Sequence, residues 1–272
     1  MENHKYPDYV FDVPVDDSKY FDVPVDDSKY TYEPYSIDCT YFISLPKLYP
    51  DRNAYLQQYC SYTNWNNVLF WPAITPSELP SESDKLYRWD SSADDICFRV
   101  KHAATTMKCS NDLLYIGNEV SGYNRCLFHS NREIFQHAVE KGYNCIAIFE
   151  DDILFHKQFP EKLDKYMLQF MNSDADILTI GDGCKIHISN YLPDNASKLS
   201  DDLWLNKLSH VRCTDSLIYK QNAIQKMAKY LSSGAKRHLP IDWEYNWLFR
   251  ELGLKVAWAE PTIITQSSQL HM

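Results

Sequence analysis

Short apolar runs of strand length alternate along the chain with stretches whose apolar residues recur at helical spacing. The stretch from Phe159 to Phe170, for example, places Leu163, Met167 and Phe170 on one helical face. The pattern predicts strands at 41–45, 68–71, 145–149, 177–180, 216–219 and 254–258. It predicts helices at 52–59, 94–108, 159–170, 222–231 and 242–252, and a surface loop over 75–95.

A further helix is indicated between Ser130 and Gly142. Glu133 follows Ser130 at the spacing of a capping box, in which Ser130 would be the N-cap. Apolar residues then recur at helical spacing, and glycine is typical of a helix C-terminus. This helix leads directly into the strand at 145–149.

The order of these elements predicts an α/β fold. Strands that alternate with helices of these lengths form a mainly parallel sheet covered by helices on both faces. A chain of 272 residues fits one large domain or two small ones, and we expect a single domain over 38–272. Ligands of such sheets bind at the carboxyl ends of strands.

The first 37 residues differ in character from the rest. The decapeptide F-D-V-P-V-D-D-S-K-Y stands at 11–20 and again, unchanged, at 21–30. Such a tandem copy is too short to build a repeat array. Its acids, prolines and tyrosine-rich flanks are typical of an extended, flexible arm. The arm has two interpretations, a passive tail and a docking tag.

Three consecutive acids, Glu150, Asp151 and Asp152, follow the strand at 145–149 and precede a second apolar run. Charges left unpaired beside a core are costly, so such clusters usually hold a metal or meet cations. Side chains alternate along an extended segment, so Glu150 and Asp152 point one way and Asp151 the other. A solvated turn is the alternative.

Composition limits the classes of partner and site that the chain could have. A net charge of −10 argues against nucleic acid. Neither a phosphate-binding loop nor a dinucleotide fingerprint is present. Eight cysteines without a C-x-x-C pair make a zinc site or a disulfide framework unexpected. The sequence has no signal peptide and no apolar run of about 18 residues. We therefore expect no transmembrane segment and a cytoplasmic location, which suits a viral or bacterial source.

The acidic motif belongs to an ordered set of motifs. I-S-L-P-K-L-Y-P-D-R ends at Arg52, and the element from Gly122 to Ser130 contains Cys126. I-F-E-D-D-I follows, then Pro240-Ile241-Asp242, and finally a proline and Gln266. This set resembles glycosyltransferase family 25, which includes lipooligosaccharide and collagen galactosyltransferases. The chain departs from the family at three places, namely Tyr123, Arg125 and the order His129-Ser130.

The resemblance implies a GT-A (Rossmann-like) fold, a nucleotide-sugar donor and inversion at the anomeric carbon. It favours UDP-galactose or UDP-glucose as donor, and a glycan or glycoprotein as acceptor, as in lipopolysaccharide biosynthesis. A leaving nucleoside diphosphate needs its charge neutralised, and hard carboxylates suit Mn²⁺ or Mg²⁺. Asp152 is the first candidate for the metal, with Glu150 reaching the metal or the donor.

An inverting transferase also needs a base for the acceptor hydroxyl. Asp242 matches the family's P-x-D segment, although an aspartate there is equally typical of a helix N-cap. Glu244 and Asp215 are reserve candidates. Tyr245 is a candidate for stacking on a sugar, whereas Trp243 and Trp247 are expected in the core.

The remaining candidates belong to the donor side. Each has a structural alternative: a surface ion pair for the arginine, a structural role for the histidine and a turn for Asp182. His271 is a candidate for the metal shell, with a frayed terminus as its alternative. The expected donor-binding residues are Arg52, His129, Glu150, Asp151, Asp182 and Gln266.

Two other classes of function stay open. A catalytically inactive relative that binds a carbohydrate or a nucleotide sugar would explain the altered element at 122–130. A carboxylate-dependent hydrolase is the other, but a glycosidase places its acids across the scissile bond from each other. The leading hypothesis is a metal-dependent inverting glycosyltransferase that moves a hexose.

Overall fold

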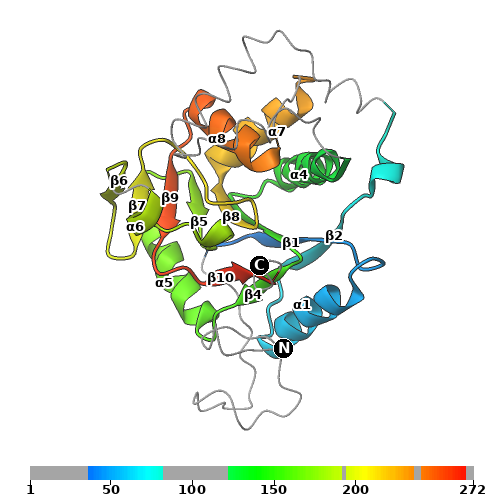
Figure 1. Ribbon diagram of the computed structural model, residues 1–272, viewed down its shortest axis with the longest axis horizontal. Helices are drawn as coiled ribbons and strands as arrows, with labels where there is room; N and C mark the ends of the chain where they lie inside the picture. Colours follow the sequence, from blue (N-terminus) through cyan, green and yellow to red (C-terminus); the bar gives the residue numbers. More distant parts are fainter. Residues whose placement is uncertain (1–35, 82–121, 192–193, 236–239, 268–272) are drawn as a thin grey trace.

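The structure is a computed structural model, and it describes residues 36–81, 122–191, 194–235 and 240–267. An eight-stranded sheet lies at its centre, in the order β2-β1-β3-β8-β5-β9-β7-β6 (Figure 1). The strands are β1 (Cys39–Ser44), β2 (Val68–Pro72), β3 (Cys145–Glu150), β5 (Ile177–Thr179), β6 (Ala196–Lys198), β7 (Leu203–Asn206), β8 (Ser216–Lys220) and β9 (Val256–Ala259).

Most strands of this sheet run in one direction. β1 is parallel to both β2 and β3, and β5 is parallel to β9. β8 is antiparallel to its neighbours β3 and β5, and β7 is antiparallel to β9 and β6. Only β8 and β7 therefore oppose the direction of the other strands in the described sheet. The predicted α/β fold with a mainly parallel sheet is confirmed.

Helices cover both faces of the sheet (Figure 1). α1 (Pro50–Tyr62) and α5 (Phe159–Met171) pack on one face, whereas α4 (Gly122–Lys141), α7 (Gln221–Ser232) and α8 (Ile241–Glu251) pack on the other. Strand β3 separates the two cores, because Cys145, Ala147 and Phe149 join the first and Ile146 and Ile148 the second. Burial on both faces explains why β3 reads as an unbroken apolar run. The described part of the chain also contains the short helices η2 (Pro76–Glu78), η4 (Gly183–Lys185) and α6 (Ile188–Tyr191).

A second, small sheet brings the far end of the chain back to the acidic motif. β4 (Ile153–Phe155) pairs antiparallel with β10 (Ile264–Gln266), and Gln266 lies opposite Ile153. The backbone N–H of Ser267 donates to the carbonyl of Asp152 at 2.6 Å. Residues beyond β9 therefore form one wall beside the three acids.

The expected capping box at Ser130 is wrong. Helix α4 begins at Gly122, so Ser130 lies in its interior. The buried hydroxyl of Ser130 donates to the carbonyl of Cys126 at 3.1 Å. A serine hydroxyl can bond the carbonyl four residues back as readily as it caps a helix. The S-x-x-E spacing therefore occurs here without a helix start.

The expected arrangement of aromatic residues on α8 is also wrong. Tyr245 is fully buried, with its ring 5.2 Å from that of Phe249 and 6.2 Å from that of Phe128. Trp243 and Trp247 are only partly buried, although Trp247 packs against the core as expected. The stripe that faces the core runs from the first residue of the helix through Tyr245 to Phe249, so the tryptophans flank it.

Some expectations concern residues outside the described part of the chain. These are the N-terminal arm apart from residues 36 and 37, the helix at 94–108, the loop beyond residue 81, and His271. Among the described residues, no helix combines the length and the apolar character needed to cross a membrane.

Candidate active site

Glu150 and Asp242, which lie far apart in the sequence, contact the same side chain. The hydroxyl oxygen of Thr214 lies 2.8 Å from Oε1 of Glu150 and 3.0 Å from Oδ1 of Asp242. The backbone N–H of Thr214 also donates to Oδ1 of Asp242, at 2.9 Å. The carboxyl end of β3, the segment before β8 and the first turn of α8 therefore meet at one point.

Asp242 is not the N-cap of α8. The helix begins at Ile241, its N-cap position is Pro240, and no side chain caps it. Asp242 lies in the first turn, where the helix dipole favours a negative charge. Its Oδ1 accepts hydrogen bonds from Thr214, which belongs to a different segment. The alternative that the sequence left open for Asp242 is therefore excluded.

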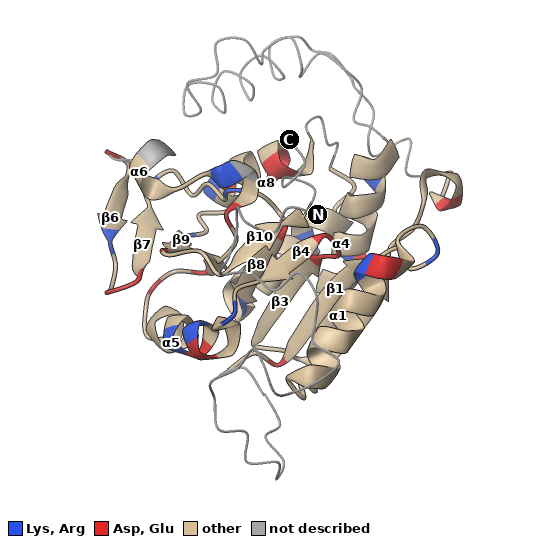
Figure 2. Ribbon diagram, turned by 60° about the horizontal axis from the view of Figure 1, so that its bottom comes forward, with Lys and Arg blue, Asp and Glu red and all other residues tan. Residues whose placement is uncertain are grey.

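Negative charge is concentrated around Glu150. Burial raises the pKa of Glu150 well above its ordinary value, and the charges of Asp152, Asp242 and Asp215 raise it further. The hydrogen bond from Thr214 opposes the shift. Figure 2 shows acidic positions on α8 and beside β4 and β10. A site with this charge favours a cationic ligand or a ligand that arrives with a cation.

Asp215 lies behind Glu150 and is fully buried. Its carbonyl accepts the N–H of Glu150 at 2.9 Å, and its Oδ2 accepts the hydroxyl of Ser216 at 3.0 Å. Burial raises the pKa of Asp215 to about 7. The hydrogen bond from Ser216 lowers this pKa, and the charges of neighbouring acids raise it. A Cβ at Gly181 would lie 2.2 Å from Oδ2 of Asp215, so this position requires glycine.

Asp151 points toward other partners than Glu150. Its Oδ1 lies 3.1 Å from Nη1 of Arg52, and its Oδ2 accepts the backbone N–H of Leu45 at 3.1 Å. Arg52 also lies over the ring of Tyr49, at 4.3 Å. These contacts join the acidic motif to the end of β1 and the start of α1.

Two of the expected residues have their described contacts away from Thr214. His129 is 3.4 Å from Glu133, one turn along the same helix. Glu244 is fully buried, and its Oε1 accepts the hydroxyl of Tyr230 in α7 at 3.3 Å. Glu244 therefore faces the packing between α8 and α7, whereas Asp242 faces the site.

The altered element at 122–130 lies against the start of α8. Oδ1 of Asn124 accepts the backbone N–H of Ile241 at 3.1 Å. Tyr123, which stands where the family has an acid, is 64% exposed. Asn124, the residue after the substituted Tyr123, therefore contacts the segment that carries Asp242.

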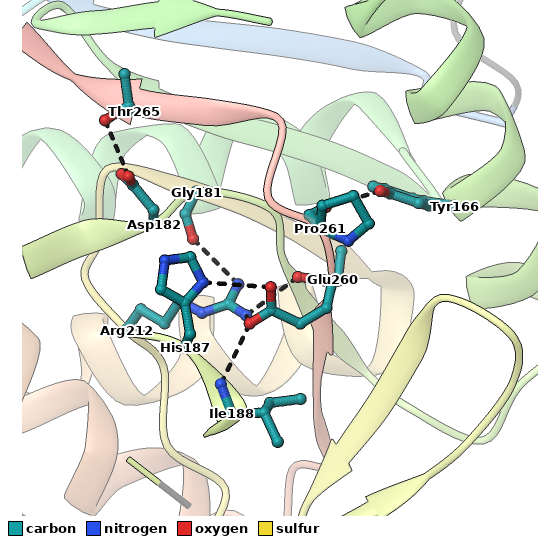
Figure 3. A network of polar contacts seen from close by, with 10 residues as sticks. Tyr166, Gly181, Asp182, His187, Ile188, Arg212, Glu260, Pro261 and Thr265 are labelled. Atoms are coloured by element: carbon teal, nitrogen blue, oxygen red, sulfur yellow. Dashed lines mark hydrogen bonds and ion pairs between the residues drawn. The ribbon is translucent and has the colours of Figure 1, made fainter. Parts of the chain in front are cut away.

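A buried arginine that the sequence did not single out supports this part of the fold (Figure 3). Arg212 is fully buried, and it donates to the carbonyls of Gly181 at 3.1 Å and Ala259 at 3.0 Å. It pairs with Glu260, and its guanidinium lies 4.4 Å from the ring centroid of Trp258. Arg212 thus joins the segment before β8 to the ends of β5 and β9.

Glu260 extends the network into the segment after β5. Its carboxylate accepts the backbone N–H of Ile188 at 3.2 Å and lies 3.3 Å from Nδ1 of His187. Asp182 in the same segment is buried, and its Oδ2 accepts the hydroxyl of Thr265 at 3.0 Å. Burial raises the pKa of Asp182. Figure 3 shows that these contacts hold the segment against the chain that leads into β10.

Gln266 lies at the end of β10 and is 8% exposed. Its Oε1 is 3.9 Å from Sγ of Cys213, the residue before Thr214. The structure therefore brings together Glu150, Asp152, Asp215, Asp242 and, on the C-terminal wall, Gln266.

Sequence reasoning missed Thr214 and Arg212. Both belong to the segment V-R-C-T-D at 211–215, which directly precedes β8 and in which the sequence pattern indicated only Asp215. Polar residues that directly precede a buried strand are one available signal. The pattern alone did not indicate which strands and helices the segment would join.

The metal hypothesis requires side-chain oxygens that can bind a cation. Glu150 and Asp152 offer carboxylate oxygens, the ligands that Mg²⁺ and Mn²⁺ prefer. Within the described ranges, no group of three or more His, Cys, Asp or Glu side chains is arranged to hold an ion. Mg²⁺ is commonly held by one or two carboxylates together with substrate phosphates. The two acids fit that mode of binding.

Comparison with known proteins decides the family. The family model described as glycosyltransferase family 25 (LPS biosynthesis protein) matches residues 38–243. The chain belongs to this family. The matched range of family 25 contains the acidic motif, Thr214 and Asp242, while Gln266 lies beyond it. A comparison with curated proteins gave no match. The chain is therefore a glycosyltransferase, and the acids at the end of β3 form its candidate active site.

Proposed function

We propose that this glycosyltransferase is metal-dependent and inverting, and that it moves a hexose from a nucleoside diphosphate sugar to a glycan or protein-linked acceptor. The observation that carries the proposal is the shared contact of Glu150 and Asp242 with Thr214. Through it, acids suited to a cation and an acid suited to proton removal lie side by side.

Glu150 and Asp152 would hold the cation, Mn²⁺ or Mg²⁺. When bound, such an ion supplies Lewis-acid stabilisation of the negative charge on the departing diphosphate. Glu150 is surrounded by other acids, so its charged form is costly without a cation. A bound cation would remove that cost, which gives these residues a physical reason to bind donor and metal together.

Asp242 would act as the general base. Oδ1 already accepts the backbone N–H of Thr214 and shares the hydroxyl proton of Thr214 with Oε1 of Glu150, whereas Oδ2 accepts no hydrogen bond from a described residue. Oδ2 would take the proton of the acceptor hydroxyl as its oxygen bonds to the anomeric carbon. The bond from that carbon to the diphosphate oxygen breaks, and the diphosphate leaves with the electron pair. Attack opposite the leaving group inverts the anomeric configuration.

UDP-galactose and UDP-glucose remain the favoured donors. The association of family 25 with LPS biosynthesis supports a glycan as the acceptor. Gln266 and Asp182 would line the donor side, because both lie on the chain segments that flank the acidic motif.

The test uses the purified full chain with UDP-, GDP- and CMP-sugars, with Mn²⁺ or with chelator. We expect release of UDP that depends on the metal, from one or both UDP-hexoses. Release that ignores chelator would overturn the metal role of Glu150 and Asp152. Binding without release under all conditions would favour an inactive, sugar-nucleotide-binding relative.

Variants separate the two roles. Asp152→Asn should abolish metal-dependent binding of UDP, measured by calorimetry. Asp242→Asn should keep that binding and lower kcat by about 10²–10⁴-fold, the usual contribution of a general base. Asp201→Asn is the matched control, because Asp201 is an exposed acid. Transfer by Asp242→Asn within a few-fold of the parent protein would assign the base to another residue.

A further inference from the structure

Thr214 contacts one oxygen of each of two carboxylates. Its hydroxyl is hydrogen-bonded to Oε1 of Glu150 and Oδ1 of Asp242, and its N–H donates to the same oxygen of Asp242. The described contacts leave Oε2 of Glu150 and Oδ2 of Asp242 without a hydrogen bond. Thr214 therefore engages one oxygen of each acid and leaves the other without a described hydrogen bond.

The position of Thr214 is itself well determined. The residue is 6% exposed and directly precedes Asp215, whose carbonyl accepts the N–H of Glu150 at 2.9 Å. Ser216, the next residue, pairs with Phe149 in the register of β3 and β8. The backbone of Thr214 is thereby fixed to the end of β3, on which Glu150 stands.

Asp242 depends on Thr214 for this alignment. It lies on α8, which packs on the sheet without belonging to it, so the distance between the carboxylates of Asp242 and Glu150 depends on that packing and on the contacts of both with Thr214. The described hydrogen bonds of the Asp242 carboxylate all come from Thr214. A misplacement of about 1 Å in a catalytic group can cost about 10²-fold in rate.

We infer that Thr214 is a positioning residue, whose hydroxyl holds the base Asp242 in alignment with the donor-side acid Glu150. The inference rests on the proposed role of Asp242. Thr214 touches neither donor nor acceptor in this proposal, and it acts through Asp242. The hydroxyl is the essential part, since the backbone N–H contributes a bond whatever the side chain.

The test compares two substitutions of similar size. Thr214→Val removes the hydroxyl and keeps both the shape and the backbone N–H, whereas Thr214→Ser keeps the hydroxyl. With Mn²⁺ and the active UDP-hexose, we expect Thr214→Val to lower kcat about 10- to 100-fold. The KM for the donor should stay within about threefold, and Thr214→Ser should restore kcat to within about threefold of the parent protein. Thermal unfolding of each variant establishes that it is folded.

A double variant shows through which residue Thr214 acts. If Thr214 acts through Asp242, Thr214→Val should cost little further activity in the Asp242→Asn background, because residues that act as a unit are not additive. Full additivity would overturn the inference, as would a Thr214→Val protein that is folded and keeps its kcat. If Asp242→Asn alone retains activity, the proposed base fails first. A collapse of Asp242→Asn with an unaffected Thr214→Val protein would sink only the role of Thr214.

Discussion

The carboxylate of Asp151 and the guanidinium of Arg52 form an ion pair at 3.1 Å, and this pair fastens the acidic motif to helix α1. The second oxygen of Asp151 accepts the N–H of Leu45. Both oxygens of the middle acid are thus bonded within the protein, while its neighbours Glu150 and Asp152 lie close to Asp215. Glu150 ends β3, whereas Asp151 and Asp152 form the turn that leads into β4, so this division arises at the turn and not along one extended strand.

Removal of Asp151 should therefore lower stability. We expect Asp151→Ala to reduce the free energy of unfolding by about 1–3 kcal/mol, since it leaves the N–H of Leu45 without its acceptor. Arg52→Ala should cost less, because the side chain of Arg52 is one-third exposed and solvent screens the pair. Urea denaturation measures both values, with Asp201→Ala as control. An unchanged unfolding free energy for Asp151→Ala, together with lost binding of UDP, would instead place Asp151 among the ligand-binding groups.

The acidic motif could be located from the sequence, because it directly follows the apolar run of β3. Its expected alternation along one extended segment is wrong, since Asp151 and Asp152 form a turn between β3 and β4. Asp242 could be nominated only by its resemblance to a P-x-D segment. Its approach to Glu150 depends on how α8 packs on the sheet, which local periodicity does not determine. Tyr245 illustrates the same limit, because a helix with aromatic residues on several sides does not reveal which of them faces the core.

The directions of the strands could be predicted only in part. Alternating strands and helices indicated a mainly parallel sheet, and β1, β3 and β5 follow that rule. The reversed strand β8 inserts between β3 and β5, and it carries Thr214 and Asp215 to the carboxyl end of β3. No sequence motif indicated that β8 lies between β3 and β5, so the sequence did not point to Thr214.

Asp215 should make stability depend on pH. Its pKa is about 7 in the folded protein, against an ordinary value of 3.8, because burial disfavours its charged form. The folded state therefore binds more protons than the unfolded state between these two values. The contribution of Asp215 to stability is greatest near and below pH 4, declines as pH rises toward 7, and is constant above that.

The size of this effect is on the order of 1 kcal/mol per pH unit within the window. Unfolding free energies of the metal-free protein from pH 5 to pH 8 measure it, and Asp215→Asn should flatten the decline. Ser216→Ala is a useful second variant. Loss of its hydrogen bond, which favours the charged carboxylate, should raise the pKa of Asp215 further and extend the decline to higher pH. A parent protein and an Asp215→Asn variant with parallel pH profiles would refute the prediction.

The buried pair of Arg212 and Glu260 should show strong coupling. Arg212→Met leaves Glu260 without its buried cation, and loss of one partner of a buried pair costs about 3–5 kcal/mol. Glu260→Gln should cost less, because Arg212 keeps its bonds to the carbonyls of Gly181 and Ala259. The double variant should be less destabilised than the sum of the single variants, since the pair contributes only once. Equilibrium denaturation of all four proteins gives the coupling energy.

Lys165→Met is the matched control, because the lysine of the pair Lys165–Asp202 is solvent-exposed. Loss of that pair should leave stability nearly unchanged. Additive costs for Arg212 and Glu260 would mean that the carbonyl bonds alone hold the ends of β5 and β9 together.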